Sequence, residues 1–377
     1  SQFATLCSNL LFRYVFILNS ILFTAETDIP QVKTIKDTMI YGVCMGFVKL
    51  GHQVTLAAAN EYRPIREEDY DFDVRFFSSD YTKLCKPSVL PYSKTMKRYL
   101  KECHKEFDMI ISSEVFQFQS LYAAMMCPKK TLIWQELTTH QNKLYQIPSK
   151  IWYNIIARFF MRKIMAVIPR SRMAYDFVSH YMPRVSSIIV DHGIDIDKFV
   201  LFTKKKRQVI SSSQLILRKN VDSIIHIFAK FHQMRNYEDI KLLIAGRGEE
   251  ETNLKHLVDD LGLQNCIEFV GFLSQSKLNE YIRESLAFLV NTRKDLNMVS
   301  IPEAIISGTP ILTNLKPASS DYIINYDLGI AKDNWNEMDM KLLVDKNEEY
   351  VGNCIKCREY FTNTHSAKLF LEIFGQK

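Results

Sequence analysis

The residue types and spacings that could carry chemistry are most concentrated in residues 295–314, DLNMVSIPEAIISGTPILTN. Two carboxylates, Asp295 and Glu303, lie eight positions apart, with a predicted helix start at Ser300-Ile301-Pro302 between them. A proline in the first helical turn and a Gly308-Thr309-Pro310 stop after the helix are the usual helix punctuation. Free N–H groups at a helix start suit an anion such as phosphate, and carboxylates accept hydrogen bonds from hydroxyl groups. The segment therefore predicts a site for a ligand with phosphate groups and sugar hydroxyls.

Length and composition limit the class of protein. A chain of 377 residues predicts about two domains, and 47% apolar residues without a low-complexity tract exclude a disordered protein. The formal charge of +6 comes from residues 1–200, which hold 25 Lys and Arg against 19 Asp and Glu, because residues 201–377 hold 23 of each. The basic residues are scattered and no nucleic-acid-binding motif is present, which argues against nucleic acid as a partner. An anionic membrane surface fits better.

Strand patterns alternate with helical patterns along the chain. Strands are expected at residues 21–25, 53–58, 109–112, 131–134, 165–168, 187–190, 208–212, 241–245, 267–270, 287–290 and 311–313. Amphipathic helices are expected at residues 33–50 and 94–106. Such alternation is typical of parallel sheets with right-handed crossovers. The predicted fold class is therefore α/β, with two Rossmann-like doubly wound domains that bind ligands at the carboxyl ends of their strands.

The linker and the cysteines add two expectations. A composition shift at residues 195–207 marks the linker, and its Lys204-Lys205-Lys206-Arg207 run is interpreted as a solvated hinge face, with a lipid contact as the alternative. The eight Cys show no disulfide spacing, so a reducing cytosol fits. The lone Cys354-x-x-Cys357 pair is interpreted as part of a helix rather than a metal or redox site.

The N-terminal residues 3–23 are apolar, but Asn9, Arg13 and Asn19 interrupt them. No uninterrupted apolar run reaches the roughly 18 residues of a spanning helix, and no small-residue cleavage site stands out. A first buried strand is expected near residues 20–26. We expect a cytoplasmic protein, with the inner face of the membrane as a further possibility.

Several segments, in the right order, resemble family-4 retaining glycosyltransferases. Asp295 and Glu303 resemble the family's E-x7-E motif, with Asp in the first place. Five further segments carry the resemblance. KLGHQVT (49–55) resembles the end of the family's first helix and its second strand, and DHGIDIDKF (191–199) resembles the exit from the first domain. LILRKNVD (215–222) resembles the phosphate loop, and KLLIAGRGE (241–249) and IEFVGFL (267–273) resemble the strands that follow it. The resemblance implies the GT-B fold, in which two Rossmann-like domains face each other across a cleft. It implies an acceptor-side domain of residues 1–200, a nucleotide-sugar-binding domain of 201–358, and a helix of 359–377 that returns to the first domain.

The resemblance assigns the donor site and three expected catalytic residues, Lys219, Asp295 and Glu303, to the second domain. Lys219 stands at the place of the family's diphosphate lysine, where a cation stabilises the leaving group. Gln214 replaces the family's Arg five residues earlier, and Arg218 can compensate for it. Glu303 would accept hydrogen bonds from ribose hydroxyls, and Asp295 would contact the donor sugar. Each residue has a structural alternative: Lys219 as a surface lysine, Glu303 as a helix-start carboxylate favoured by the helix dipole, and Asp295 as a loop cap.

Backbone contacts complete the expected donor site. Met298 and Val299 stand where backbone N–H groups meet the donor, and Leu296-Asn297-Met298 replaces the family's Gly-Phe-Gly, which puts Asn297 in the donor loop. The backbone of Phe272 and Leu273 would lie against the base. The donor would be a UDP or GDP sugar that acts as a substrate, and no metal site and no cofactor are expected.

On the first domain, three residues are candidates for the acceptor side. Glu114 follows the strand that ends at Ser112-Ser113, Glu136 follows the next one, and His140 lies a turn further on. Each has a purely structural alternative. The family's glycine pair after the first strand is absent from residues 27–34, and the family needs no protein nucleophile.

Residues 151–167, IWYNIIARFFMRKIMAV, mix aromatic residues with Arg158, Arg162 and Lys163. A core-packed helix and a membrane-facing helix are both open, and the basic segment 94–105 supports the second. A membrane-facing helix would fit a lipid-linked acceptor.

These features predict a retaining, metal-independent glycosyltransferase. It would move a hexose from a nucleotide diphosphate sugar to a sugar or lipid-linked acceptor, in polysaccharide or glycoconjugate biosynthesis. A nucleotide-sugar 2-epimerase of the same fold is the first alternative. A non-catalytic nucleotide-sugar-binding partner subunit is the second, suggested by Gln214 and the missing glycines.

Overall fold

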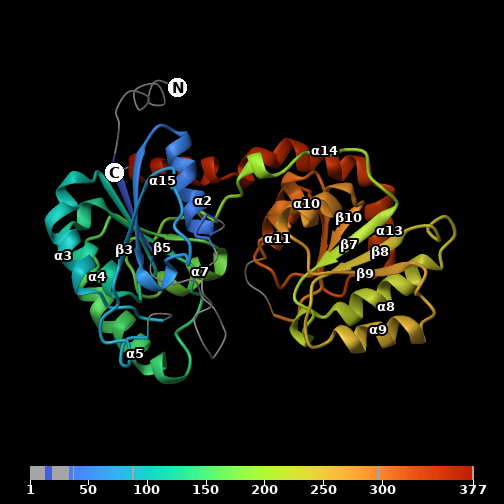
Figure 1. Cartoon of the computed structure of the whole chain (residues 1–377), viewed down its shortest axis with the longest axis horizontal. Coiled ribbons are helices and arrows are strands. Elements are labelled where there is room, and N and C mark those ends of the chain that lie inside the picture. Colours follow the sequence, from blue (N-terminus) through green and yellow to red (C-terminus); the bar gives the residue numbers. More distant parts are fainter. Residues whose placement is uncertain (1–12, 19–33, 37, 87–88, 295–297, 376–377) are drawn as a thin grey trace. The chain divides into compact units, whose positions relative to one another are not determined.

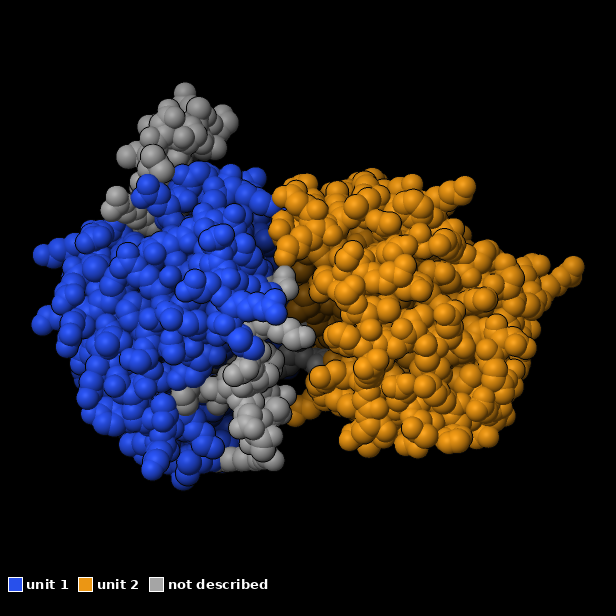
Figure 2. Space-filling model, viewed as in Figure 1, with its two compact units in different colours: residues 1–193, 362–377 blue, residues 194–361 orange. Residues whose placement is uncertain are grey.

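The chain forms two compact α/β units in a computed structural model that describes residues 13–18, 34–36, 38–86, 89–294 and 298–375. Unit 1 comprises residues 1–193 and 362–377, and unit 2 comprises residues 194–361 (Figure 2). The chain leaves and re-enters unit 1 at neighbouring points, because Ile194 N–H donates to the Phe361 carbonyl at 2.8 Å. The two boundaries thus differ by a few residues from the expected 200/201 and 358/359.

Unit 1 contains a six-stranded parallel sheet with the order β3-β2-β1-β4-β5-β6 (Figure 1). Its strands are β1 (Arg13–Leu18), β2 (Gln53–Ala59), β3 (Asp73–Phe77), β4 (Met109–Ser113), β5 (Thr131–Gln135) and β6 (Ala166–Pro169). The strand predicted at 21–25 lies outside the described residues, and the central strand is instead the preceding apolar run. The strand predicted at 187–190 is wrong, since this edge has only an isolated bridge between Val167 and Val185.

The helices of unit 1 cover both faces of this sheet. They are α2 (Met39–Lys49), α3 (Lys94–Cys103), α4 (Phe118–Met126), α5 (Gln146–Ile151), the π-helix η6 (Trp152–Ala157), α6 (Arg158–Phe160), α7 (Arg172–Ser179) and α15 (Asn363–Gly375). The helix predicted from residue 33 starts at Met39, where the Thr38 side chain caps it by accepting from Tyr41 N–H. The C-terminal helix α15 packs on α2, where Phe370 contacts Phe47 and Trp134.

Unit 2 contains a second six-stranded parallel sheet, with the order β12-β11-β10-β7-β8-β9. Its strands are β7 (Gln208–Ser212), β8 (Lys241–Ala245), β9 (Ile267–Gly271), β10 (Ala287–Leu289), β11 (Ile311–Thr313) and β12 (Gly329–Ala331). Its helices are α8 (Val221–His232), α9 (Glu251–Asp260), α10 (Gln275–Glu284), α11 (Ser300–Ile306), α12 (Ser320–Asn325), α13 (Glu337–Asp345) and α14 (Asn347–Cys357). Short 3₁₀ turns are η2 (Asn60–Tyr62), η3 (His104–Glu106), η4 (Pro128–Lys130), η5 (Lys143–Tyr145), η7 (Ile196–Lys198), η8 (Leu217–Lys219) and η9 (Arg358–Phe361).

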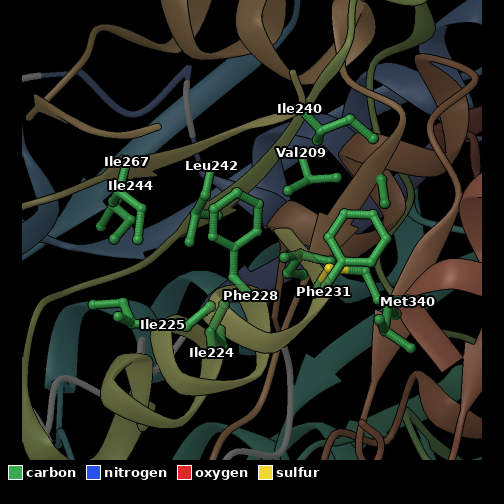
Figure 3. Close-up of a cluster of buried hydrophobic side chains, with 14 of the residues drawn as sticks. Val209, Ile224, Ile225, Phe228, Phe231, Ile240, Leu242, Ile244, Ile267 and Met340 are labelled. Atoms are coloured by element: carbon green, nitrogen blue, oxygen red, sulfur yellow. The ribbon is translucent and has the colours of Figure 1, made fainter. Parts of the chain in front are cut away.

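The core of unit 2 fixes α8 on the sheet. Phe228 and Phe231 of α8 are fully buried against Val209 of β7 and Leu242 of β8, as Figure 3 shows. Burial of each such aromatic side chain stabilises the fold by roughly 2–3 kcal/mol. The packing holds the amino end of α8 beside the carboxyl end of β7.

Both sheets have the doubly wound strand order 3-2-1-4-5-6. In such sheets the crevice for a ligand lies where the strand order reverses, outside the carboxyl ends of the strands. The reversal falls between β1 and β4 in unit 1 and between β7 and β10 in unit 2. The prediction of two doubly wound α/β domains is confirmed.

The interpretation of residues 204–207 as a solvated hinge face is wrong for Lys205. Its ammonium donates to the Arg283 carbonyl at 2.7 Å and to Thr309 Oγ1 at 3.0 Å, and burial lowers the pKa of Lys205 to about 8. The neighbours also have partners, since Lys206 pairs with Glu284 at 2.5 Å. These contacts therefore hold the residues before β7 against the end of α10 and the residue Thr309 after α11.

Candidate functional site

Lys219 lies in the loop that follows β7, at the reversal point of the unit 2 sheet. The loop ends in η8, whose last residue Lys219 donates its N–H to the Ile216 carbonyl at 2.9 Å, and Asn220 follows with φ 55°. Lys219 is half-buried, whereas Gln214 and Arg218 are exposed. The loop therefore presents three side chains that the sequence assigned to a diphosphate, with Lys219 the most firmly enclosed.

Arg218 links this loop to the one after β10. Its guanidinium donates to the Lys294 carbonyl at 3.1 Å, and its own carbonyl accepts from the Arg293 N–H at 2.9 Å and the Thr292 hydroxyl at 3.1 Å. The loop after β10 leads to residues 295–297, so the predicted contacts of Asp295 and Asn297 lie outside the described residues. The structure nevertheless brings the Lys219 loop and the start of that loop together.

Two glycines fix the Lys219 loop from the other side, and the sequence interpretation gave them no role. A Cβ at Gly246 would lie 1.8 Å from the Ser213 carbonyl oxygen, and a Cβ at Gly248 would lie 2.1 Å from that of Leu215. Only glycine allows such backbone contact between the loops after β7 and β8. The spacing of the two glycines after a buried strand was the signal that could have revealed it.

Glu303 is buried in the first turn of α11, with 8% exposure. Its Oε1 accepts a hydrogen bond of 2.6 Å from the side-chain amide of Gln275, the first residue of α10. The apolar side of α11, which includes Ile301, Ala304 and Ile305, is packed in the core beside β10 and β11. The carboxylate is therefore held in one orientation at the carboxyl ends of the unit 2 strands.

Four further predicted donor residues lie at the same edge of the sheet. Phe272 and Leu273 follow β9 directly after Gly271, which has φ 69°, and the Phe272 side chain is 74% exposed. Met298 packs against the core beneath α11, and Val299 is the residue before the helix. The exposed ring of Phe272 is the largest apolar side chain among these residues.

Gln275→Ala is expected to raise the donor KM about tenfold, because the loss of one hydrogen bond to a charged group frees the Glu303 carboxylate to rotate. Steady-state kinetics at varied donor concentration measure it. Gln264→Ala, which removes an exposed amide elsewhere in unit 2, is the matched control. An unchanged KM in Gln275→Ala would mean that Glu303 needs no support from α10.

Glu114 and Glu136 meet at the carboxyl ends of β4 and β5 in unit 1. Glu114, with φ 62°, is buried, and its Oε1 accepts from the backbone N–H groups of Glu136 at 2.7 Å and Leu137 at 3.3 Å. Burial and the charge of Glu136 raise the pKa of Glu114 to about 8. Glu114 is therefore largely protonated at neutral pH.

Arg170, which the sequence interpretation missed, joins this cluster. It follows β6 and donates to Glu136 Oε2 at 2.6 Å and to His192 Nδ1 at 3.1 Å, with its guanidinium 4.6 Å from the centre of the Trp134 ring. His192 Nδ1 also lies 2.8 Å from Asp191 Oδ1. The buried Arg170 guanidinium therefore lies among Glu136, Asp191 and His192. Arg170 is 34 positions from Glu136 and 22 from His192, so spacing gave no signal.

His140 has different partners. Its ring nitrogens lie 3.2 Å from Ser149 Oγ and 3.0 Å from the Tyr181 hydroxyl, and its ring packs edge-on against Tyr153 and Phe177. These are the contacts of a packed side chain. A role on the acceptor side stays a prediction for all three residues.

The protonated state of Glu114 predicts a pH dependence of stability. The pKa of Glu114 is about 8 in the folded chain and 4.5 ordinarily, so the protonated side chain contributes to the free energy of unfolding. This contribution is complete below pH 4.5 and is lost as the pH rises to about 8. The free energy of unfolding should fall by up to about 1.4 kcal/mol per pH unit in this window. Denaturant unfolding of the native chain, of Glu114→Gln and of the exposed-residue control Glu102→Gln measures it. The decrease should be smaller in Glu114→Gln than in the native chain and in Glu102→Gln, and an equal decrease in all three would contradict the assignment.

Cys354 and Cys357 lie on α14, as the helical interpretation predicted. Across the part of the chain that the structure describes, no group of three His, Cys, Asp or Glu is arranged to hold a metal ion.

Comparison with known proteins finds a family match for the second unit. The family described as Glycosyl transferases group 1 matches residues 194–360. The alpha-monoglucosyldiacylglycerol synthase of Streptococcus pneumoniae is 23% identical over 192 residues, which cover 47% of this chain and 43% of the synthase. The chain thus spans about half the length of the curated relatives that it matches first. An uncharacterized glycosyltransferase of Haemophilus influenzae is 20% identical over 84% of this chain and 88% of its own.

Among solved structures, HepE of Anabaena in complex with UDP superimposes with a TM-score of 0.64 at 12% identity, over 97% of this chain and 100% of HepE. Such a likeness extends over both units and shows the fold. The glycosyl transferases group 1 model thus matches nearly all of the second unit, and the chain as a whole has the GT-B fold, as the resemblance to family 4 implied.

Proposed function

We propose that the chain is a retaining glycosyltransferase. It moves a hexose from a nucleotide diphosphate sugar to a sugar or lipid-linked acceptor, in polysaccharide or glycoconjugate biosynthesis, and needs no metal. Two relatives support this class, because they are named alpha-monoglucosyldiacylglycerol synthase and amylovoran biosynthesis glycosyltransferase. UDP is the first donor nucleotide to test, since HepE was solved with UDP. The proposed location is the cytoplasm or the inner face of the membrane.

The observation that carries the proposal is the orientation of Glu303. A carboxylate that is 8% exposed and fixed by Gln275 at 2.6 Å can accept hydrogen bonds from ribose hydroxyls in a defined geometry. It lies in the unit that matches the family, at the same sheet edge as the Lys219 loop.

The proposed reaction then needs few groups from the protein. The bond between the anomeric carbon and the diphosphate oxygen breaks, and the acceptor oxygen forms a bond on the same face. The acceptor proton passes to the departing phosphate oxygen, so we assign no protein nucleophile. Lys219 would stabilise the charge that develops on the diphosphate, which takes the place of a metal ion in that role.

A thermal-shift panel of UDP- and GDP-sugars tests the donor first. A ligand at about 100 times its Kd should stabilise the fold by about 2.7 kcal/mol. Incubation of the stabilising sugar with candidate acceptors, with and without EDTA, then tests transfer, and NMR of the product gives the anomeric configuration. Absence of binding throughout the panel would overturn the proposal, and an inverted product or loss of activity in EDTA would overturn its finer parts.

The same incubation separates the alternatives. Conversion of the UDP-sugar alone to its 2-epimer would indicate an epimerase. Binding without transfer or donor hydrolysis would indicate a partner subunit, which the exposed Gln214 in place of a cation suggests.

A further inference from the structure

The helical segment of residues 146–160 exposes a row of apolar side chains. It consists of α5, η6 and α6, which follow one another without a break, and α5 is marked in Figure 1. Ile147, Ile151, Ile155 and Phe159 recur at every fourth position and are 69%, 50%, 52% and 67% exposed. We call these four residues the apolar row. Large side chains exposed in a contiguous row on a folded helix mark an interaction surface rather than ordinary surface scatter.

The opposite face of the same helix is held in the core, so its orientation is fixed. Trp152, Tyr153 and Ala157 are buried, and Trp152 Nε1 donates to the Val115 carbonyl at 2.8 Å. Tyr153 also accepts from the Gln135 amide at 3.2 Å. The helix therefore uses one face for the fold and presents the apolar row outward. The core-packed and membrane-facing interpretations of this segment are compatible with each other.

Basic residues accompany the apolar row. Lys150, Arg158, Arg162 and Lys163 are all exposed, and we call them the basic row. The sequence contains no Asp or Glu between Glu136 and Asp176. An amphipathic helix with apolar side chains flanked by cations and without carboxylates is complementary to an anionic lipid surface, in which acyl chains receive the apolar groups and headgroups receive the cations.

We propose that the apolar row and the basic row form a docking surface for an anionic lipid bilayer. A second copy of the chain is a poorer occupant, because a two-fold interface would place each basic row against an equally basic surface. The helix would lie in the plane of the interface. Among the described residues no helix is long and apolar enough to cross a membrane. The proposal deepens the membrane location given under the proposed function and rests on it only for that location, since bilayer binding requires no transfer activity.

Vesicle co-sedimentation of the full chain tests it. Vesicles of phosphatidylcholine with about 30% phosphatidylglycerol should bind the chain at least about tenfold more tightly than vesicles of phosphatidylcholine alone, and high salt should weaken the binding. Ile151→Ser/Ile155→Ser/Phe159→Ser, which removes most of the apolar row, should lower binding about tenfold or more. Lys150→Gln/Arg162→Gln/Lys163→Gln should abolish the preference for the anionic vesicles.

The control removes three exposed apolar side chains of unit 2 in Ile324→Ser/Met338→Ser/Leu342→Ser and should leave binding unchanged. All variants change exposed residues, and thermal unfolding checks that each one folds. Equal sedimentation of the unchanged chain and the apolar-row variant would overturn the proposal. So would a dimer in solution that the apolar-row variant dissociates while neither protein binds vesicles. Donor binding in the thermal-shift panel is scored separately, so failure here leaves the proposed function intact.

Discussion

Glu303→Gln is expected to lower kcat/KM about 100-fold. The substitution keeps the size of the side chain and an oxygen that can accept from the Gln275 amide, at 2.6 Å in the native protein. It replaces the second carboxylate oxygen with an N–H donor and removes the charge. Hydrogen bonds to a charged group contribute about 1.5–3 kcal/mol each, and an acceptor that becomes a donor loses that contribution. Steady-state transfer kinetics with the donor identified in the panel measure the loss.

The ribose contact can be isolated by changing the ligand. UDP should bind Glu303→Gln much more weakly than the native chain, and this loss should be smaller for 2′-deoxy-UDP, because the deoxy compound lacks one of the hydroxyls that the carboxylate would hold. Glu348→Gln, which removes an exposed carboxylate from the first turn of α14, is the matched control. Equal losses for both nucleotides would mean that Glu303 does not hold the 2′-hydroxyl.

Lys219→Ala is expected to lower kcat about 100- to 1,000-fold. A preorganised cation beside the leaving group is worth most where negative charge develops, and Lys219 is half-buried in a loop held by the loops after β8 and β10. Single-turnover kinetics at saturating donor separate this loss from weaker binding. Lys219→Arg should recover part of the rate, because it restores the charge with a different shape.

Comparison of UDP with uridine tests whether Lys219 contacts the diphosphate. UDP should bind Lys219→Ala more weakly than the native chain, whereas uridine should bind both equally, since uridine carries no phosphate. Lys230→Ala, which removes an exposed lysine at the other end of α8, serves as the control. A rate within threefold of the native value in Lys219→Ala would mean that Lys219 is a surface lysine without a role in catalysis.

The fold was largely predictable from the sequence because buried parallel strands are continuous apolar runs. The predicted bounds of β7, β8 and β11 are those of the structure. Three strands of the structure, β1, β3 and β12, were not predicted. Two of them, β3 and β12, lie at the edges of their sheets, where burial is incomplete and the apolar run is short or carries charge. The predicted strand at 187–190 failed for the related reason that an apolar segment can pack at an edge without pairing.

The candidate site was predictable only in part. Lys219 and Glu303 were predicted because their neighbours resemble a family pattern along the chain, and the structure places both at the carboxyl ends of the unit 2 strands. Gln275 and Arg170 were not found, because each acts on a carboxylate 28 or 34 positions away and neither lies in a local pattern. The partners of Lys205 were missed for the same reason, since Arg283 and Thr309 are 78 and 104 positions away.

The sequence by itself determined the two doubly wound units, because periodicity and helix punctuation act over a few residues. The expected ligand of the second unit came from the resemblance to a family and stays a prediction. Only the tertiary structure decided the partners of the carboxylates. Gln275 donates a hydrogen bond to Glu303, Arg170 donates one to Glu136, and burial raises the pKa of Glu114. It also decided which face of the helix at 146–160 is buried and which is exposed. Hydrogen bonds and burial depend on groups brought together by the packing of distant elements, and the order of residues along the chain does not encode these contacts locally.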